Sequence, residues 1–308
     1  MKKKTHKLII IGIGPAGYTA SIYSSRYRLN NLLIGNLPGG QITEAHKVCN
    51  FPNSPEITGM ELGDQMRKHA KGLGAEEIID DVIKLEKIGE LFTIETRSSG
   101  TFQSKTILLA HGTKRRKLNL EKEENLTGKG ISYCATCDGV FYQKKIVAVA
   151  GGSNAATTAA LLLSDIARKV YIIYRGSNLR GDEMWIEQAR SKKNIEIVYD
   201  SNIVELIGDD KLRGVKLDNL FNKKSIIDLD GLFVEIGSTP NIEFIKGIDI
   251  ETDEKGYVKV GKDQSTNIPN LYAAGDITNG SNGFRQVITA CSEGAIAAQA
   301  IHMSLAKQ

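Results

Sequence analysis

The sequence predicts an α/β protein built from two three-layer domains, the second inserted into the first. Short apolar strands run into glycine-rich turns at two places, residues 7–17 and 146–156, and a helical stretch follows each turn. A third stretch, 271–276, returns to the same strand-and-turn pattern and would complete the first domain. At 308 residues the chain is long enough for two domains, each with a sizeable core.

The first domain is expected to open with a strand over residues 7–11, an apolar and β-branched run typical of a buried parallel strand. The turn Gly12-Ile13-Gly14-Pro15-Ala16-Gly17 follows, then a helix over 18–26 and a second strand over 31–34. Placed between a strand and a helix, this G-x-G-x-x-G turn predicts a Rossmann-like dinucleotide-binding unit. Its glycines allow a tight turn, close approach of a pyrophosphate to the backbone, and close helix packing.

The end of the second strand lacks the acidic residue that usually holds a ribose hydroxyl in such units. Gly35 and Asn36 stand where an Asp or Glu would be. We therefore do not expect an ordinary NAD site here. FAD remains compatible, because other groups can hold its ribose.

A second version of the pattern begins near residue 145. A strand over 146–150 leads into the turn 151–156, and a helix over 157–164 and a strand over 169–174 follow. We expect a first domain of residues 1–115 and 243–308 and an inserted second domain of residues 116–242. The linkers are expected at 114–118 and 240–243.

Composition narrows the function classes. Apolar residues make up 41% of the chain and charged residues 25%, which is ordinary for a soluble globular protein. The net charge of +4 comes without an aromatic–basic motif, so nucleic acid is not an expected partner, whereas an acidic protein is compatible. The densest basic run, Lys114-Arg115-Arg116-Lys117, is interpreted as a solvated linker. No apolar stretch of about 18 residues predicts a membrane span.

Cysteine spacing gives the strongest chemical signal. Among four cysteines, Cys134 and Cys137 form a C-x-x-C pair, which in a reducing cytoplasm is typical of a redox-active site. Asp138 follows directly and could handle the proton that thiol chemistry moves, or could instead cap a helix. A zinc site would need two further ligands at suitable spacing, and none is present, so no metal is expected. Cys49 and Cys291 are interpreted as buried small apolar residues.

With these residues in place, the chain resembles the low-molecular-weight thioredoxin reductases. The matching motifs occur in the family's order and cover essentially the whole chain. They are Gly12-Ile13-Gly14-Pro15-Ala16-Gly17, Gly39-Gly40-Gln41-Ile42, Asn50-Phe51-Pro52, Cys134-Ala135-Thr136-Cys137-Asp138, Ala274-Gly275-Asp276-Ile277 and Arg285-Gln286.

The resemblance implies an FAD enzyme that reduces thioredoxin, usually as a cytoplasmic homodimer. It implies that Cys137 is the sulfur near the flavin, that Cys134 attacks the thioredoxin disulfide, and that Asp138 protonates the leaving thiolate. The FAD-binding residues that it implies are Gly12, Gly14, Pro15, Ala16, Gly17, Gly35, Gly40, Gln41, Asn50, Val82, Ala110, Gly112, Gly275, Asp276, Arg285, Gln286 and Val287.

The second nucleotide site departs from the family pattern. NADPH-dependent members usually carry G-G-G-x-x-A, and here the third glycine is Ser153, whose side chain would obstruct a pyrophosphate. The family's H-R-R-x-x-x-R cluster, which grips a 2′-phosphate, reads Tyr174-Arg175-Gly176-Ser177-Asn178-Leu179-Arg180. The residues left for a nicotinamide cofactor are Gly151, Ser153, Ala156, Arg175 and Arg180.

Two donors stay open. The degraded site resembles the ferredoxin-dependent flavin thioredoxin reductases, in which another protein feeds the flavin. Alternatively, Arg175 and Arg180 suffice and the enzyme uses NADPH or NADH. A hypothesis of a different functional class is a redox sensor, which would bind flavin but would not catalyse turnover.

Overall fold

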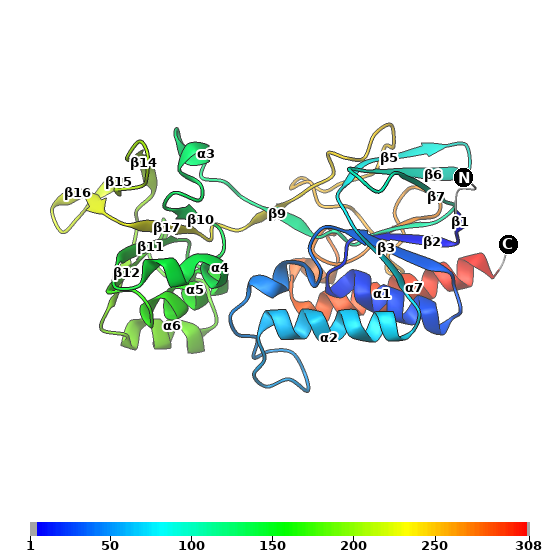
Figure 1. Ribbon diagram of the computed structural model, residues 1–308, viewed down its shortest axis with the longest axis horizontal. Helices are drawn as coiled ribbons and strands as arrows, with labels where there is room; N and C mark the ends of the chain where they lie inside the picture. The colour runs from blue at the N-terminus through cyan, green and yellow to red at the C-terminus, as the bar shows by residue number, and fades with distance from the viewer. Residues whose placement is uncertain (1–4, 307–308) are drawn as a thin grey trace. The chain divides into compact units, whose positions relative to one another are not determined.

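The computed structural model describes residues 5–306, and these divide into two compact units. The first unit contains residues 5–43, 48–114 and 239–306. The second contains Arg115–Ser238 together with the short segment Glu44–Lys47. Each unit is described by itself below (Figure 1).

The first unit is built on a parallel five-stranded sheet in the order β19-β8-β2-β3-β4. Its strands are β19 (Leu271–Ala273), β8 (Ile107–Leu109), β2 (Leu8–Ile11), β3 (Asn31–Gly35) and β4 (Glu76–Ile79). The three central strands β8, β2 and β3 are buried almost throughout, which explains why their sequences are continuous apolar runs.

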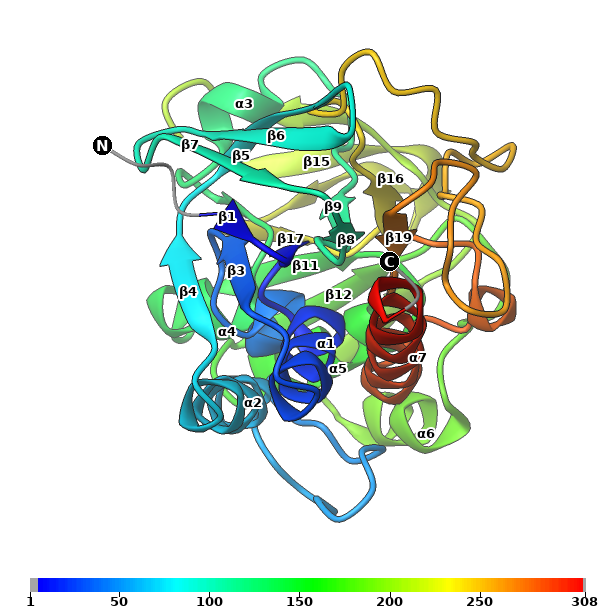
Figure 2. The same ribbon diagram turned by 90° about the vertical axis from the view of Figure 1, so that its right-hand side faces the viewer.

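Helices cover one face of this sheet and a second sheet covers the other (Figure 2). The helices are α1 (Pro15–Arg26), α2 (Gly59–Gly72) and α7 (Val287–Leu305). The second sheet consists of β1 (Thr5–His6), β7 (Thr101–Ser104), β6 (Leu91–Thr96) and β5 (Val82–Ile88). Ile9 and Ile34 of the parallel sheet pack with Leu85 and Phe92 of this second sheet in one buried cluster. Two short 3₁₀ helices, η1 (Gly40–Glu44) and η3 (Ser281–Gly283), follow β3 and precede α7.

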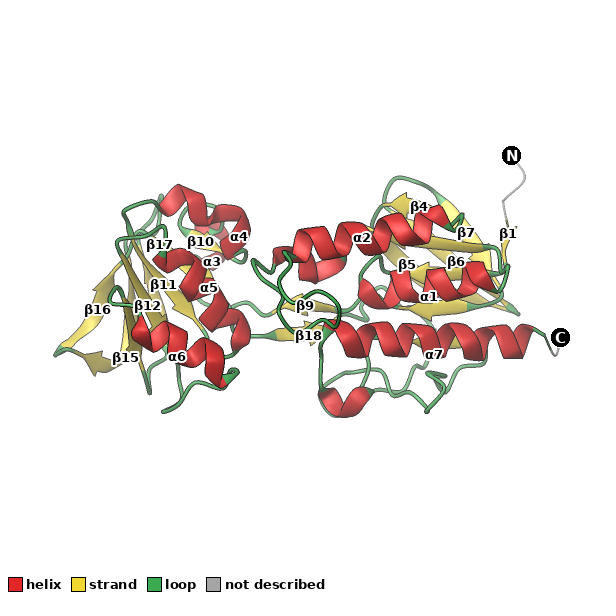
Figure 3. Ribbon diagram, turned by 90° about the horizontal axis from the view of Figure 1, so that it is seen from below, coloured by secondary structure: helices red, strands yellow, loops and turns green. Residues whose placement is uncertain are grey.

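The second unit repeats the three layers on a smaller scale (Figure 3). Its parallel sheet has the order β10-β17-β11-β12-β13. The strands are β10 (Ile131–Ser132), β17 (Gly231–Val234), β11 (Ile146–Ala150), β12 (Lys169–Ile173) and β13 (Ile195–Val198). The helical segments are α3 (Glu123–Leu126), α4 (Ala135–Asp138), η2 (Gly139–Tyr142), α5 (Asn154–Ser164) and α6 (Glu183–Ser191). An antiparallel sheet of β14 (Ile203–Ile207), β15 (Gly214–Phe221) and β16 (Lys224–Asp228) completes the unit.

These layers confirm the predicted fold class. Both helices that follow a glycine-rich turn begin three residues earlier than the sequence pattern suggested. In α1 the reason is Pro15, whose fixed φ suits the first helical position. The segments expected as linkers overlap the ends of two short strands, β9 (Thr113–Arg115) and β18 (Ser238–Pro240), which pair with each other. Among residues 5–306, no helix combines the length and apolar character needed to span a membrane.

Candidate dithiol and nucleotide sites

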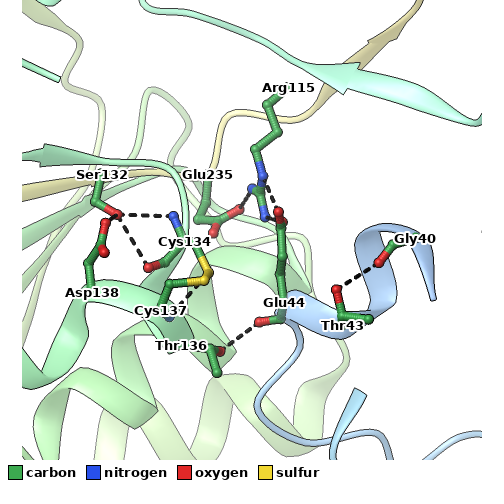
Figure 4. Close-up of a disulfide and its surroundings, with 10 residues drawn as sticks. All are labelled: Gly40, Thr43, Glu44, Arg115, Ser132, Cys134, Thr136, Cys137, Asp138 and Glu235. Carbon is green, nitrogen blue, oxygen red and sulfur yellow. Dashed lines mark hydrogen bonds and ion pairs between the residues drawn. A yellow bond between two sulfur atoms is a disulfide. The ribbon is translucent and has the colours of Figure 1, made fainter. Parts of the chain in front are cut away.

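Cys134 and Cys137 form a disulfide at the start of α4, with their Cα atoms 5.3 Å apart (Figure 4). Cys134 is the N-cap of the helix, and its Sγ accepts a hydrogen bond from the Cys137 N–H at 3.1 Å. Cys134 is half-buried, whereas Cys137 is exposed. A backbone N–H directed at one sulfur favours negative charge there, so the arrangement favours a thiolate at Cys134 once the disulfide is reduced.

Ser132 connects Asp138 to the first cysteine. Its hydroxyl donates to Asp138 Oδ2 at 2.7 Å and accepts the Cys134 N–H at 3.0 Å (Figure 4). The Cys134 carbonyl is a second acceptor for the same hydroxyl, at 3.2 Å. Ser132 is buried, so water competes little for these bonds. Asp138 precedes η2, but its side chain makes no capping bond, so the helix-cap interpretation of this carboxyl is wrong.

Sequence reasoning missed Ser132. The available signal was its position two residues before the first cysteine. A hydroxyl at that position can reach back to the turn that carries the dithiol. Spacing alone does not show whether it does.

The basic run at 114–117 is paired with acidic or carbonyl groups. Arg115 Nε donates to Glu44 at 3.0 Å and Arg115 Nη1 donates to Glu235 at 2.6 Å (Figure 4). Burial raises the pKa of Glu235, and the Arg115 charge opposes that shift. The other three residues of the run are also held: Lys114 by Glu243, Arg116 by the Ser238 carbonyl and Lys117 by Glu124. The side chains of the run therefore have partners in the protein, but the run crosses the boundary between the two units and three of its four residues are exposed, which agrees with a solvated linker.

The first glycine-rich turn shows which glycines the fold requires. Gly12 has φ +120°, and a Cβ on it would lie 2.2 Å from the Ala110 carbonyl oxygen. A Cβ on Gly17 would lie 2.0 Å from the Gly12 oxygen. Gly14, the N-cap of α1, has no such neighbour, because the nearest atom is the Gly40 Cα at 3.5 Å. The protein itself does not exclude a side chain at Gly14, so the glycine leaves an open cradle that a phosphate could approach.

Most of the proposed FAD residues meet around this turn. Gly40 lies against Gly14, Ala110 against Gly12, and Gly275 against Ala16. Gln41 donates to the Thr113 carbonyl, and Asn50 donates to the Gln286 side chain at 2.9 Å. Pro15 opens α1 and Val287 opens α7, while Gly35 ends β3 and Val82 begins β5. Gly112 has φ +67° in the turn after β8, with open space around it.

Asp276 lies next to Gly275, and Arg285 Nε donates to its carbonyl at 3.3 Å. Burial raises the pKa of the Asp276 carboxyl to about 6, with Arg285 opposing and Glu293 adding to the shift. Glu293, which sequence reasoning missed, is buried in α7 and accepts from the Gly275 N–H at 2.7 Å and the Thr278 hydroxyl at 3.0 Å. Its only signal was a single acid in an otherwise apolar helix. Glu293 fixes the loop that carries Asp276.

The end of β3 lacks the usual ribose-binding acid, but Asp81 lies beside it and could take that role. Asn36 donates to Asp81 Oδ1 at 2.5 Å, and Arg97 forms an ion pair with the same carboxyl at 3.1 Å. Asp81 follows β4, the next strand of the sheet. Sequence reasoning missed it because the pairing of β3 with β4 is not a local property.

The second glycine-rich turn repeats the backbone of the first. Gly151 has φ +141°, and a Cβ on it would lie 2.2 Å from the Glu235 oxygen. Ser153 is the N-cap of α5, and its side chain makes no capping hydrogen bond. Ala156 is fully buried behind the turn. The Tyr174 ring packs on Gly152, where an added Cβ would lie 2.4 Å from the ring.

Two arginines flank this turn. Arg180 donates its backbone N–H to the Gly152 carbonyl at 2.6 Å, and its guanidinium lies 5.7 Å from the centre of the Tyr174 ring. Arg175 and Arg180 are both exposed, and within the described part of the chain neither forms an ion pair. Their charges are therefore free to bind an anion.

Comparisons with known proteins agree with this geometry. The family model described as pyridine nucleotide-disulphide oxidoreductase matches residues 6–294. A thioredoxin reductase of Listeria monocytogenes is 35% identical, with 97% of this chain and 93% of that protein covered. The crystal structure of a Lactococcus lactis thioredoxin reductase superposes with a TM-score of 0.92 at 34% identity, covering 98% of this chain and all of that one.

A ferredoxin-flavin thioredoxin reductase from Clostridium acetobutylicum has a TM-score of 0.54 at 29% identity, with 99% of both chains covered. The similarity to solved reductases thus extends over both units. The chain belongs to the pyridine nucleotide-disulphide oxidoreductase family.

Proposed function

We propose that this protein is a flavoprotein reductase that passes electrons from FAD through the Cys134–Cys137 dithiol to the disulfide of thioredoxin. The observation that carries the proposal is the disulfide itself, with a backbone N–H on one sulfur and a carboxyl tied to the same turn. Similarity to thioredoxin reductases over nearly the whole chain supports it. As in that family, we propose a cytoplasmic homodimer.

The first unit would be the FAD-binding domain and the second the NAD(P)-like domain that carries the dithiol. The open cradle at Gly14 and the N-terminus of α1 fit a pyrophosphate. Asp276 and Arg285 provide polar groups beside Gly275, which lies against Ala16 of this turn, and the Asn50–Gln286 pair lies in the same unit. FAD, when bound, would supply the two electrons that reduce the disulfide.

The dithiol would then exchange with the partner disulfide in two steps. The Cys134 thiolate attacks one partner sulfur, so a bond forms between proteins and the partner's own S–S bond breaks. Asp138 protonates the thiolate that leaves. The Cys137 thiol then loses its proton and attacks Cys134 Sγ, which restores the disulfide and releases the partner as a dithiol. Overall, two electrons pass from the Cys134–Cys137 pair to the partner, with one proton from Asp138 for the first leaving thiolate and the proton of Cys137 for the second.

Ser132 would act in this scheme by holding Asp138. Ser132→Ala should lower kcat roughly tenfold, the scale of one lost hydrogen bond to a charged group, and Ser132→Thr should restore most of it. If Ser132 acts only through Asp138, then adding Ser132→Ala to Asp138→Asn should cause no further loss. Losses that multiply in the double variant would instead give Ser132 an independent role.

We propose reduced ferredoxin as the electron donor. Ser153, Tyr174 and Gly176 each remove a feature of a site that grips NADPH. Losing one charge-assisted hydrogen bond costs about 1.5–3 kcal/mol, which is about tenfold to more than a hundredfold in affinity. Similarity to a ferredoxin-flavin thioredoxin reductase supports this donor.

The alternative donor is NADPH. It is favoured by one observation, the exposed guanidinium groups of Arg175 and Arg180 beside the second turn, which form no ion pair with the residues that the structure describes. Two arginines are enough to attract a 2′-phosphate.

One experiment distinguishes the two proposed electron donors and also tests thioredoxin reduction. The oxidised protein is mixed anaerobically with NADPH, NADH or reduced ferredoxin, and the flavin absorbance is followed. We expect rapid bleaching with ferredoxin only, and bleaching by micromolar NADPH would contradict that donor. Thioredoxin reduction is then measured with the wild type and with Cys134→Ser, which should keep FAD and lose turnover. Turnover that survives in Cys134→Ser would show that the attacking sulfur is misassigned, and no turnover in the wild type would favour a redox sensor.

A further inference from the structure

Basic side chains gather at the amino-terminal edge of the parallel sheet in the second unit. Each of the strands β11, β12 and β13 has two adjacent cations at its start. They are Lys144 and Lys145, Arg168 and Lys169, and Lys192 and Lys193. Because the three strands are parallel and adjacent, the turns that enter them meet at one edge of the sheet.

Backbone hydrogen bonds hold these turns together. The Lys144 N–H donates to the Ile166 carbonyl at 3.1 Å, and the Arg168 N–H donates to the Lys145 carbonyl at 2.8 Å. The side chain of Asn194 donates to the Ser164 carbonyl at 2.7 Å, which ties the entry to β13 to the same group. We call the six cations on this frame the basic edge.

The basic edge is only partly neutralised. Lys169 pairs with Glu196 and Lys192 with Asp165, both at 2.6 Å, and Asp230 accepts the Ile146 N–H. The remaining four, Lys144, Lys145, Arg168 and Lys193, are exposed and form no ion pair with any residue that the structure describes. Six cations against three carboxylates leave at this edge most of the chain's formal charge of +4.

The basic edge lies within reach of the dithiol. The helical segments α4 and η2 lead from Cys134 to Lys144. Their eight residues span about 14 Å at the rises typical of α and 3₁₀ helices. Val140 and Phe141 between them are 66% and 69% exposed. A standard protein interface buries about 800 Å² on each partner, which corresponds to a patch about 30 Å across. The dithiol follows the carboxyl end of β10, and the strand order places Lys144 and Lys145 at the nearer end of the basic edge and Lys192 and Lys193 at the farther end. A protein that presents its disulfide to Cys134 can therefore cover the Lys144–Lys145 end of the basic edge.

We propose that the basic edge is a docking surface for an acidic face of the disulfide-bearing protein substrate. The proposal rests on the proposed function, because it assigns the substrate's charge at the same dithiol. Opposite charges at the rim of an interface accelerate encounter and fix orientation without taking part in the chemistry. The edge therefore acts on substrate association and leaves the exchange step unchanged.

The test is a charge-reversal variant, Lys144→Glu/Arg168→Glu/Lys193→Glu, in the full-length FAD-loaded protein. These three side chains are exposed, and none of them forms an ion pair with a residue in the described range 5–306, so reversal should leave the fold intact. With a thioredoxin of net negative charge, we expect kcat/KM to fall at least tenfold at low salt while kcat stays unchanged. The difference should shrink as salt rises, because the screening length falls from about 10 Å at 0.1 M to about 3 Å at 1 M.

A matched control reverses three exposed lysines elsewhere in the second unit, Lys211→Glu/Lys223→Glu/Lys224→Glu. It changes the net charge by the same amount and should lower kcat/KM much less. Equal losses in the two variants would overturn the proposal, since net charge alone would explain them. An unchanged KM in the first variant would also overturn it, and so would a loss confined to flavin reduction by ferredoxin.

Direct binding separates this proposal from the proposed function. Binding of the oxidised thioredoxin to the wild type and to both variants is measured by fluorescence anisotropy at low salt. A wild type that does not reduce thioredoxin would contradict the proposed function alone, and the order of the three affinities would still decide the docking surface. Absence of binding to the wild type would overturn the docking surface.

Discussion

In the first unit the residue at the N-terminus of the turn helix is Gly14, and in the second unit it is Ser153. The backbone is nearly the same, with φ and ψ of −98° and −168° at Gly14 and −100° and −178° at Ser153. Both turns also keep a glycine with positive φ, Gly12 or Gly151, pressed against the carbonyl that follows the neighbouring strand. The glycine that the fold requires is present in both units, whereas the glycine that leaves space for a ligand is present only in the first.

The two turns also differ in where a large side chain is placed. In the first unit Ile13 lies on the turn and packs on Gly35 at the strand end, where a Cβ would be 2.8 Å from the Ile13 side chain. In the second unit the turn carries Gly152, and Tyr174 follows the strand end and packs its ring on Gly152. In either arrangement a large side chain packs between the turn and the end of the second strand.

The largest effect should come from the glycine that both turns keep. Gly12→Ala would place a methyl group 2.2 Å from the Ala110 oxygen at φ +120°, so the backbone must move. Adding backbone strain to overpacking, we expect a loss of about 4 kcal/mol in unfolding free energy. Thermal and denaturant unfolding of the purified protein measure it. Gly74→Ala is the matched control, because Gly74 has φ +85° with open space and should lose only about 1 kcal/mol.

The next effect concerns two carboxyls that follow strands of the two parallel sheets, the half-buried Asp276 after β19 and the buried Glu235 after β17. Asp276 and Glu235 both have a pKa raised by burial, but Glu235 is paired directly with Arg115. The pKa of Asp276 is about 6 in the folded protein and ordinarily 3.8, so the unfolded chain loses this proton at lower pH. The free energy of unfolding therefore falls as pH rises from about 4 to 6. At pH 8, FAD-free Asp276→Asn should be more stable than the wild type by up to about 3 kcal/mol. The difference should vanish near pH 4, and a difference that grows on acidification would contradict the shift.

Gly14→Ser converts the first turn into a copy of the second. The backbone angles at Gly14 suit any residue and no atom lies within 3.4 Å of an added Cβ, so the fold should be kept. We expect FAD affinity to fall about tenfold to a hundredfold, the scale of one or two lost charge-assisted contacts. Titration of the apoprotein with FAD, followed by flavin fluorescence, measures this. Unchanged FAD affinity would mean that a side chain at this position is tolerated. Ser153 would then not obstruct a nucleotide at the second turn either.

Sequence analysis predicted those features that are local to the chain. The two turns, their strands and helices, and the cysteine pair beside Asp138 all follow from spacing within a few residues. The approach of Asp81 to Asn36 and the basic edge depend on which strands are neighbours. The fixing of the Asp276 loop by Glu293 depends on how helix α7 packs. Lys144, Arg168 and Lys192 recur at equal intervals and each lies one to three residues before a strand, which was a usable signal. The run at 114–117 is more basic in sequence, yet Lys114 and Arg115 pair with carboxylates distant in sequence and Lys117 pairs with the nearby Glu124.

The smallest effect should come from the reverse change. Ser153→Gly restores the open cradle of the first turn but leaves Tyr174 over Gly152, so NADPH should bleach the flavin only a few times faster than in the wild type. Gly176→Arg cannot be added alone, because its Cβ would lie 2.8 Å from the Tyr174 ring. Ser153→Gly/Tyr174→His/Gly176→Arg removes that clash and supplies a third arginine beside Arg175 and Arg180. Stopped-flow reduction under anaerobic conditions compares these proteins, with Gly14→Ser as the variant changed in the other unit. If the triple variant is reduced by NADPH no faster than the wild type, these three residues are not what separates the second turn from a working nucleotide site.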